Sequence, residues 1–457
     1  MISKHYSNQP IYTLPVLNSR LYLVNDPALA ASVQRSKTLS FNPLIPNITQ
    51  RVLGFDDATR QIIATGIDRD GTNGPRGFYP DMQDLVYGLL GPGDALNELT
   101  LVAAREFSKE LDAYAMELGK PEFANVGKVE DDLLLWIRHI VTVVTARFLF
   151  GPHNPIARIP QLEESFWNFD HGIPGLLVGL LPKWTARKAY FGREALVRAL
   201  MRYIDEGSYR DGCELIQRRI EIAEKHGFSV EAVAREELTF LFAGIVNTAM
   251  TSYWMVLHIY ARPDLLKEVR AELEKCVEGD GKSKSVSVHE LKDKCELLMS
   301  IYREVLRLES DVGSTRMVTA DTILNDQYFL KKNSTLIISG GTMHQLKSVW
   351  GDDVDDFNAR RFIQLARSKE LHPAAFRAFG GGSTLCPGRH FATNEILLFV
   401  ALIVLRFDVE HPTGKELAVP GKMDDVLPVH VFEPENPVQV NIKPRSGWDD
   451  MAWYPSL

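Results

Sequence analysis

The sequence predicts a mainly α-helical protein with small β-sheets near its two ends. Three observations favour this fold class: helical periodicity through the middle, strand-like alternation at both ends, and Gly/Pro clusters that separate the pieces. The 457 residues exceed the ~250–300 at which one core usually stops growing, so length alone favours two or three domains. With 45% apolar and 24% charged residues, the chain can form a large core.

Each predicted element follows from its local pattern. A strand pair at 11–17 and 20–25 is expected around a turn at Asn18-Ser19. Gly/Pro clusters at 71–77, 91–93 and 151–160 divide the first third of the chain into helical pieces. Helices are then expected at 131–150, 193–225 with an interruption near 207–212, 238–260, 263–277 and 288–308. The remaining expected elements are a polar connection at 278–287, a hairpin at 327–339 turning at Lys332-Asn333, a helix from Pro387, and strands in the tail at 429–442.

Charge and cysteine usage exclude several classes of function. The formal net charge of −8 argues against nucleic-acid binding, which needs an excess of Lys and Arg, and favours small apolar substrates. The cysteines Cys213, Cys276, Cys295 and Cys386 form no C-x-x-C pair, which excludes the common zinc and thioredoxin-like motifs. Sparse, unpaired thiols are typical of a reducing compartment.

Targeting and membrane-spanning signals are also weak in this sequence. The first 25 residues lack a continuous apolar run, so neither an export signal nor an anchor is predicted. The segment 238–260 has no formally charged residue and is long enough to cross a bilayer. Its Asn247, Thr248, Thr251 and Ser252 favour instead a helix buried in the protein.

The segment FGGGSTLCPGRHFA, residues 379–392, is the most informative because glycines precede a cysteine at the start of an expected helix. With Cys386 as N-cap and Pro387 as first helical residue, the helix dipole would stabilise a thiolate, which is a metal ligand. The glycines at 380–382 and Gly388 would let the backbone approach a flat, bulky cofactor. A free cysteine after an ordinary turn explains the glycines but not the order F-x-x-G-x-x-x-C-x-G.

This order resembles the signature of the cytochrome P-450 superfamily, matched at Phe379, Gly382, Cys386 and Gly388, and the segment is similar to fungal members of secondary metabolism. The resemblance implies a triangular helical prism with haem b between a long distal helix and the cysteine-loop helix. Cys386 would be the axial thiolate ligand of the iron, and Phe379 would shield the sulfur. Residues 1–457 would form a single haem-thiolate domain without the N-terminal membrane anchor of microsomal members.

The resemblance also implies that cations bind the two haem propionates, although several usual cations are absent. Thr384 stands where most members carry Arg or His, a change shared with members near the cholesterol 7α-hydroxylase branch. The W-x-x-x-R motif of an early helix has no counterpart at 80–130, where no tryptophan occurs. The predicted cofactor contacts are therefore Arg316, His344 and Arg389, each with a core, strand or solvent-exposed role as the open alternative.

A charged pair in a helix supports the same resemblance. Glu304 and Arg307 lie three residues apart on one helix face, which alone is common. Here the E-x-x-R pair precedes an F-x-x-x-R-F segment at 357–362 and then the cysteine loop, in the family's order. The resemblance implies that Glu304, Arg307 and Arg361 form a structural triad that locks the cysteine loop, although Ala359 replaces the usual proline.

The expected distal helix departs from the family pattern [A/G]-G-x-[D/E]-T-[T/S], in which an acid and an alcohol relay protons to dioxygen. The sequence reads AGIVNT, so the predicted distal residues are Ala243, Gly244, Asn247 and Thr248. Gly244 would allow a bulge of the helix. Val246 replaces the acid and carries no proton, whereas the amide of Asn247 can only orient water or substrate.

Two functions therefore stay open. Asparagine near this position is similar to the branch that holds cholesterol 7α-hydroxylase, a monooxygenase, and prostacyclin synthase, an isomerase that rearranges a peroxide. The family favours a monooxygenase that inserts oxygen into a small apolar, secondary-metabolite or lipid-like substrate with O2 and electrons from an NADPH-cytochrome reductase. The alternative is a haem-thiolate isomerase that needs no external electrons.

Partners and location are expected from the same resemblance. Arg377, Arg389 and His390 flank the cysteine loop and would meet an acidic reductase domain, with a solvated rim as the alternative. The apolar stretch 172–181 would line the substrate entrance, touch a membrane, or form a buried connection. Family members sit on the cytosolic face of the endoplasmic reticulum, and this chain without an anchor is expected to be soluble. Substrate contacts are expected at 78–79, 172–181, 240–248, 311–315 and the turn at Leu427-Pro428.

Overall fold

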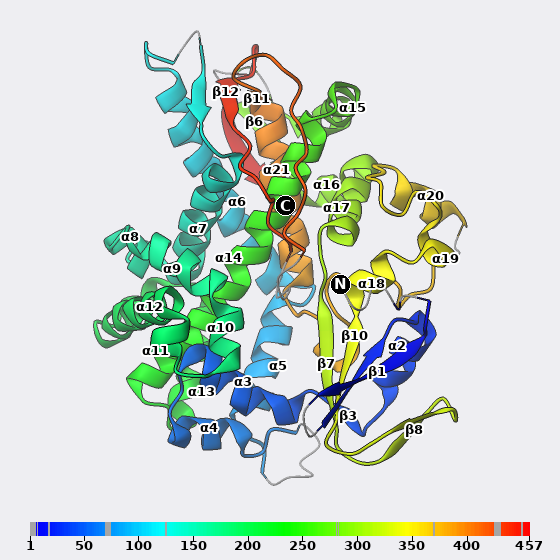
Figure 1. The fold of residues 1–457 in the computed structure, drawn as a ribbon. Helices are drawn as coiled ribbons and strands as arrows, with labels where there is room; N and C mark the ends of the chain where they lie inside the picture. Colours follow the sequence, from blue (N-terminus) through cyan, green and yellow to red (C-terminus); the bar gives the residue numbers. More distant parts are fainter. Residues whose placement is uncertain are drawn as a thin grey trace. The chain divides into compact units, whose positions relative to one another are not determined.

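The computed structural model describes residues 6, 8–16, 19–68, 75–123, 126–279, 281, 283–368, 371–424, 431–448 and 451–457. They fall into two compact units: unit 1 comprises Met1–Pro80, Arg303–Pro387 and Met423–Phe432, and unit 2 comprises Asp81–Tyr302, Gly388–Lys422 and Glu433–Leu457. Figure 1 labels the helices and strands. The predicted class, mainly α with small sheets, is confirmed.

Unit 1 contains a five-stranded sheet in the order β1-β2-β10-β7-β3. β1 and β2 pair antiparallel as predicted, while Asn18 of the expected turn lies outside the described residues. β10 runs parallel to β2 and antiparallel to β7, where Arg316 pairs with Leu336. The strands are β1 (Ile11–Val16), β2 (Ser19–Val24), β3 (Leu39–Ser40), β7 (Gly313–Val318) and β10 (Thr335–Ser339).

The hairpin predicted at 327–339 is wrong. β9 (Tyr328–Leu330) pairs instead with β8 (Thr322–Leu324), and β10 belongs to the five-stranded sheet. The tight turn forms at Asn325 and Asp326, whose φ angles of 51° and 56° lie in the left-handed region that Asn and Asp tolerate. The sequence did not reveal that β10 pairs with both β2 and β7.

The helices of unit 1 cover this sheet and carry the chain to the cysteine segment. In α2 (Pro27–Arg35) the Asp26 side chain caps the N-terminus, and Leu29, Ala30 and Val33 pack with Leu336 and Ile338 of β10. The other described helices are α3 (Ile45–Leu53), α4 (Asp57–Ala64), α18 (Gly340–His344), α19 (Lys347–Trp350), α20 (Arg361–Ser368) and the short 3₁₀ turns η1 (Asn42–Leu44) and η4 (Gly382–Thr384). α5 (Phe78–Leu90) and α17 (Glu296–Leu308) contribute residues to both units.

Unit 2 is a helical body built on the long helix α14 (Val230–Tyr260), which packs against α7, α12 and α21 (Figure 1). The Ser229 hydroxyl accepts from the Ala232 N–H and starts α14 eight residues before the predicted segment. The other helices are α6 (Asp94–Leu118), α7 (Leu133–Phe150), α8 (Pro155–Arg158), α9 (Leu162–His171), α10 (Ile173–Val178), α11 (Pro182–Thr185), α12 (Arg187–Asp205), α13 (Glu214–Lys225), α15 (Pro263–Leu273), α16 (Val288–Lys294) and α21 (Arg389–Arg406), with 3₁₀ turns η2 (Ser208–Asp211) and η3 (Glu274–Cys276).

Two predicted segments of unit 2 differ from the structure. The helix expected at 288–308 divides into α16 and α17, because the Glu272 carboxylate of α15 accepts from the N–H groups of Leu297 and Leu298 and so starts a new helix. The polar connection at 278–287 contains β6 (Ser283–Ser287), which pairs parallel with β13 (Ala452–Ser456) and antiparallel with β5 (Val277–Glu278). A second small sheet joins β11 (Phe407–Glu410), β12 (Val440–Pro444) and β4 (Lys128–Glu130).

Two described helices, α7 and α14, are long and apolar enough to cross a membrane by length and composition. Their most apolar windows are 78% and 72% buried inside the protein, as in the core helix of a globular domain. Residues 248–260 of α14 are all buried, in agreement with the interpretation of 238–260 as a core helix.

Candidate active site

The cysteine segment of unit 1 is a tight loop closed by its own backbone. The Cys386 N–H donates to the Phe379 carbonyl oxygen at 2.9 Å. Gly380 and Gly382 adopt φ angles of 73° and 63°, which L side chains rarely accept. A Cβ on Gly382 would also lie 3.0 Å from the Gln34 side chain of α2. The loop's turns and its approach to α2 therefore require these glycines.

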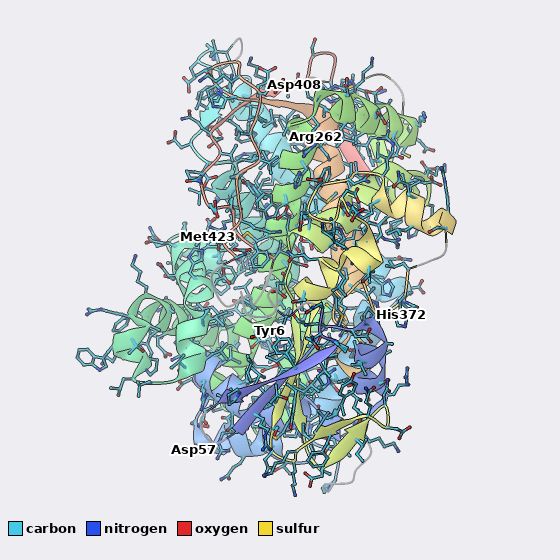
Figure 2. All side chains as sticks on the ribbon, turned by 45° about the vertical axis from the view of Figure 1, so that its right-hand side comes forward. Tyr6, Asp57, Arg262, His372, Asp408 and Met423 are labelled. Atoms are coloured by element: carbon cyan, nitrogen blue, oxygen red, sulfur yellow. The ribbon has the colours of Figure 1, made fainter. Side chains whose placement is uncertain are left out.

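Cys386 is half-buried. Its predicted position as N-cap of the following helix is wrong, because α21 begins at Arg389 with Gly388 as N-cap. The Cys386 N–H is used to close the loop, and Pro387 with Gly388 forms a turn before the helix. His372, labelled in Figure 2, is exposed in the loop that leads from α20 to this segment.

The structure brings the predicted triad together. Glu304 accepts from Nε and Nη2 of Arg307 at 2.9 and 2.8 Å, and from Nε of Arg361 at 3.0 and 3.1 Å. Glu304 is 0%, Arg307 1% and Arg361 4% exposed. Loss of one member of such a buried charged network typically costs about 3–5 kcal/mol, because the remaining charges stay in the interior without compensation. The triad is therefore a rigid part of unit 1.

Arg316 reaches the position at which the family pattern is broken. It lies on β7, its side chain is 2% exposed, and its Nη2 donates to Thr384 Oγ1 at 2.7 Å. Its Nη1 donates to the Thr315 carbonyl oxygen at 2.7 Å. A cation is thus present beside Thr384, although Thr384 itself is neutral.

His344 has a different environment from a cationic contact. Its ring is fully buried, Nε2 accepts from the Arg377 backbone N–H at 2.9 Å, and the ring stacks on Phe376 with centroids 5.5 Å apart. Burial, together with the nearby charge of Arg307, lowers the pKa of His344 to about 3. A neutral ring fits the alternative of a core residue that the sequence left open.

The cations expected to face a reductase are not equivalent. Arg377 is 1% exposed, so its expected contact with a partner protein is wrong. Arg389 and His390 are half-buried at the start of α21 and stay predicted members of that surface. Burial and the charges of Arg389 and Lys292 lower the pKa of His390, which favours its neutral form.

In unit 2, α14 has one open stripe. Ala243 and Asn247 are exposed, and Phe240 and Gly244 are half-buried, whereas Val246 between them is buried. Positions three or four apart share one face of a helix, so these four residues form a single stripe. Thr248 is 4% exposed and lies beside the stripe. Three of the four predicted distal residues therefore share one accessible face.

Position 244 requires a small residue because the neighbouring helix α7 packs closely against it. A Cβ at this position would lie 3.1 Å from Thr145 Cγ2 and 3.4 Å from Leu149 Cδ1 of α7. α14 is a continuous α-helix from Val230 to Tyr260, so the bulge expected at Gly244 is absent from it. The glycine permits close packing of α7 and α14.

Sequence reasoning missed a buried acid. Thr248 Oγ1 donates to Glu395 Oε2 of α21 at 3.2 Å, and Glu395 Oε1 has no hydrogen-bond partner within the described parts of the chain. Burial raises the pKa of Glu395 to about 8, although the Thr248 bond opposes the rise, so the carboxyl is mostly protonated at neutral pH. The available signal was a single acid in the apolar run of residues 391–405.

The expected substrate segments are distributed over both units. Residues 78–79 and 311–315 belong to unit 1, residues 172–181 and 240–248 belong to unit 2, and Leu427 and Pro428 lie outside the described residues. Within unit 2, Phe169 just before 172–181 meets Phe242 of α14 edge-on, with ring centroids 6.2 Å apart. The end of α9, which leads into 172–181, is therefore next to 240–248.

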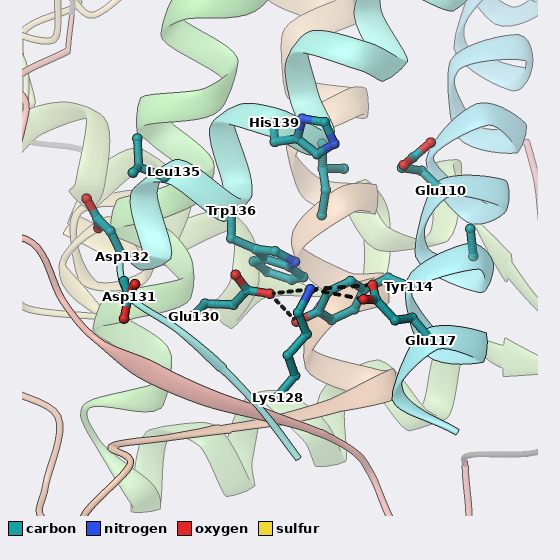
Figure 3. A pocket seen from close by; sticks show the side chains of 12 residues that line it. Glu110, Tyr114, Glu117, Lys128, Glu130, Asp131, Asp132, Leu135, Trp136 and His139 are labelled. Atoms are coloured by element: carbon teal, nitrogen blue, oxygen red, sulfur yellow. Dashed lines mark hydrogen bonds and ion pairs between the residues drawn. The ribbon is translucent and has the colours of Figure 1, made fainter. Parts of the chain in front are cut away.

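An acidic cavity of about 510 Å³ in unit 2 is separate from these residues, and none of the predicted site residues lines it (Figure 3). Lys128 Nζ lies 3.2 Å from Glu130 and 3.4 Å from Glu117, and Tyr114 donates to Glu130 at 2.9 Å. Glu117 and Glu130 are thus already bound by side chains of the same chain, and the cavity is not the candidate active site.

Comparisons with known proteins agree with these observations. A sequence model described as "Cytochrome P450" matches residues 202–436. A "Cytochrome P450 monooxygenase" of Gibberella zeae is 29% identical over 99% of this chain and 85% of its own length. A bifunctional cytochrome P450/NADPH–P450 reductase of Alternaria alternata is 31% identical over 48% of this chain and 19% of its own length. The solved structure of a zebra fish cytochrome P450 with abiraterone has a TM-score of 0.70 at 21% identity, over 97% of this chain and 99% of that one. The chain therefore belongs to the cytochrome P450 family of haem-thiolate proteins, and it is a monooxygenase with the fold of that family.

Proposed function

We propose that the chain inserts one atom of O2 into a small apolar, secondary-metabolite or lipid-like substrate, with electrons from an NADPH–P450 reductase. The open stripe of α14 carries this proposal, because it offers an apolar surface from Phe240 to Gly244 with the single amide of Asn247 at its end. Such a surface fits a ligand that is mostly apolar and has one polar group to orient. The relative in Alternaria that includes a reductase supports the choice of electron donor.

The residues present fit a haem b. Cys386 would hold the iron through its thiolate, in a loop that its own N–H closes onto the Phe379 carbonyl oxygen and whose turn Gly382 permits. The Glu304 triad would support this loop from within unit 1. Arg316 would bind an anionic side group of the haem next to Thr384. Gly388 and Arg389 would complete the loop at the start of α21. The bound haem supplies the activation of dioxygen.

The protein's own task on the distal side is to orient groups and hold a proton. Asn247 is exposed on the stripe and would position water or substrate through its amide. Val246 is buried and cannot hold a proton, but Glu395 carries one at neutral pH and contacts Thr248, the residue after Asn247. Glu395 would therefore provide the acidic proton that the family's usual distal acid supplies.

Electron dependence separates this function from its alternative, the rearrangement of a peroxide without external electrons. The purified protein is incubated with a panel of apolar substrates under ¹⁸O2, with and without NADPH and a reductase. We expect products that contain ¹⁸O only when both NADPH and reductase are present. Turnover without them, or products without ¹⁸O, would refute the monooxygenase proposal and support an isomerase.

An exposed apolar patch supports the expected peripheral membrane contact. Val178, Leu180, Leu181 and Trp184 are 70%, 66%, 66% and 74% exposed, beside the exposed cations Lys183, Arg187 and Lys188. Apolar side chains flanked by cations fit the surface of an anionic lipid bilayer. The stretch 172–181 is thus not a buried connection at its C-terminal end.

A vesicle assay tests this contact. Replacing Val178, Leu180 and Leu181 with serine should lower binding to phosphatidylserine-containing vesicles roughly tenfold or more, because burial of one such side chain is worth about 1.5–3 kcal/mol. Ile323→Ser with Phe329→Ser is the control, since these residues of β8 and β9 are 64% and 59% exposed. Equal binding by the two variants would contradict a specific membrane patch.

A further inference from the structure

Nine arginines are buried among the described residues, and seven of them have a carboxylate partner. The ion pairs of those seven arginines have N···O distances between 2.5 and 3.3 Å. Arg316 and Arg377 are the two buried arginines without an acid partner in the described part of the chain. The seven paired arginines are Arg138, Arg193, Arg219, Arg235, Arg307, Arg361 and Arg406.

Arg377 is held in position by neutral groups alone. Its Nη2 donates to Ser314 Oγ at 3.2 Å. With the Gln34 amide oriented to place its oxygen toward the arginine, that oxygen accepts from Nη1 at 2.8 Å and from Nη2 at 3.2 Å. The Nε of Arg377 has no partner within the described residues. The guanidinium is therefore positioned but not neutralised.

The two unpaired cations lie in one region of unit 1. Ser314 and Arg316 are two residues apart on β7 and so project from the same face of the strand, and Arg377 contacts Ser314. Burial, and the nearby positive charge of Arg316, lower the pKa of Arg377 to about 10. Two buried like charges without an anion are unfavourable, and the arrangement therefore points to an anionic ligand.

We propose that Arg377 is the second propionate-binding cation of this protein and acts with Arg316 on the anionic edge of the haem. This inference rests on the proposed function, since it requires that a haem binds beside the cysteine segment. Arg377 would replace the cation that is absent at Thr384 and the one that is absent from the early helix. Gln34 and Ser314 position its guanidinium, which can make charge-assisted hydrogen bonds to a carboxylate.

The test measures how fast the purified holoenzyme loses haem to an excess of apomyoglobin. Arg377→Leu should accelerate haem loss about tenfold or more, because charge-assisted hydrogen bonds to the ligand are removed. Arg377→Lys should restore part of the retention, since it keeps the charge without the planar fork. Gln34→Met should accelerate haem loss less than Arg377→Leu, because the cation remains but is no longer held.

Arg406→Leu is the matched control, because Arg406 is equally buried but pairs with Asp112. Unchanged haem loss in Arg377→Leu, or acceleration no greater than in Arg406→Leu, would overturn the proposal. If Arg377→Leu does not fold, Arg377→Lys and Gln34→Met decide: wild-type retention in both would overturn it, and faster loss in both would support it. Failure of the proposed function is visible separately, as absence of a thiolate-ligated haem spectrum in the wild-type protein.

Discussion

Replacing Cys386 with serine is expected to abolish both oxygenation and the red-shifted carbon-monoxide band of the reduced haem, while the polypeptide stays folded. An unperturbed thiol ionises near pH 8.5 and binds iron as a thiolate, whereas a serine hydroxyl remains neutral. The fold should tolerate the change, since the side chain is half-buried and the loop is closed by the Cys386 backbone N–H. Product formation, the carbon-monoxide difference spectrum and far-UV circular dichroism measure these three effects.

Cys213→Ser is a matched control for this experiment. Cys213 is also a half-buried cysteine, and it also precedes a helix, as the N-cap of α13. Burial raises the pKa of its thiol to about 11, so it is a poor source of thiolate. The control should keep the red-shifted band. A band that persists in Cys386→Ser, or disappears equally in Cys213→Ser, would rule out Cys386 as the ligand.

Replacing Glu395 with glutamine is expected to remove a large pH dependence of stability. The pKa of this carboxyl is about 8 in the folded protein, against an ordinary value of 4.5. Between these two values the folded chain keeps a proton that the unfolded chain releases. The free energy of unfolding of the wild type should therefore fall by about 1.4 kcal/mol per pH unit from roughly pH 5 to pH 8. Below this window the stabilising effect of the neutral form is fully present, and above it the loss is complete.

The glutamine variant stays neutral at every pH and should lack this fall, so it should be more stable than wild type at pH 8 by an amount on the order of several kcal/mol. Urea unfolding at a series of pH values measures the difference. Glu237 is equally buried and its pKa is also raised, to about 7, but its carboxylate pairs with Arg219. Glu237→Gln should therefore be less stable than wild type at pH 8, because Arg219 loses its partner. Parallel stability curves for wild type and Glu395→Gln would show that the carboxyl ionises normally.

The sequence predicted those features that depend on short motifs or local order. The cysteine loop, the E-x-x-R pair and the apolar helix α14 each depend on residues that are close together in the sequence. The sequence therefore predicts that they exist and where they lie. The three triad residues are in contact as expected, because Arg361 is the arginine of the F-x-x-x-R-F segment that is buried against Glu304.

The features that the sequence did not predict depend on partners far away in the chain. The local sequence around Arg377 predicts a surface cation. In the structure Arg377 is enclosed by Gln34 and Ser314, which are more than 60 residues away in the sequence. The pKa of Glu395 follows from burial against α14, about 150 residues earlier. The pairing of β10 with β2 likewise joins segments from opposite parts of the sequence. The helix and strand propensities of neighbouring residues do not indicate which distant segments will bury a side chain.

The arginines of the triad also provide hydrogen bonds to backbone carbonyl oxygens that a helix or sheet would otherwise provide. Besides Glu304, they donate to the backbone carbonyl oxygens of His344, Trp350, Asp353, Val354 and Asp356. Residues 351–360 form neither helix nor strand, so these guanidinium groups satisfy carbonyls that a ladder would otherwise satisfy. The shape of this stretch is thus held by side chains outside it, together with its own Asp353, which pairs with Arg361 at 2.9 Å, and its buried Val354.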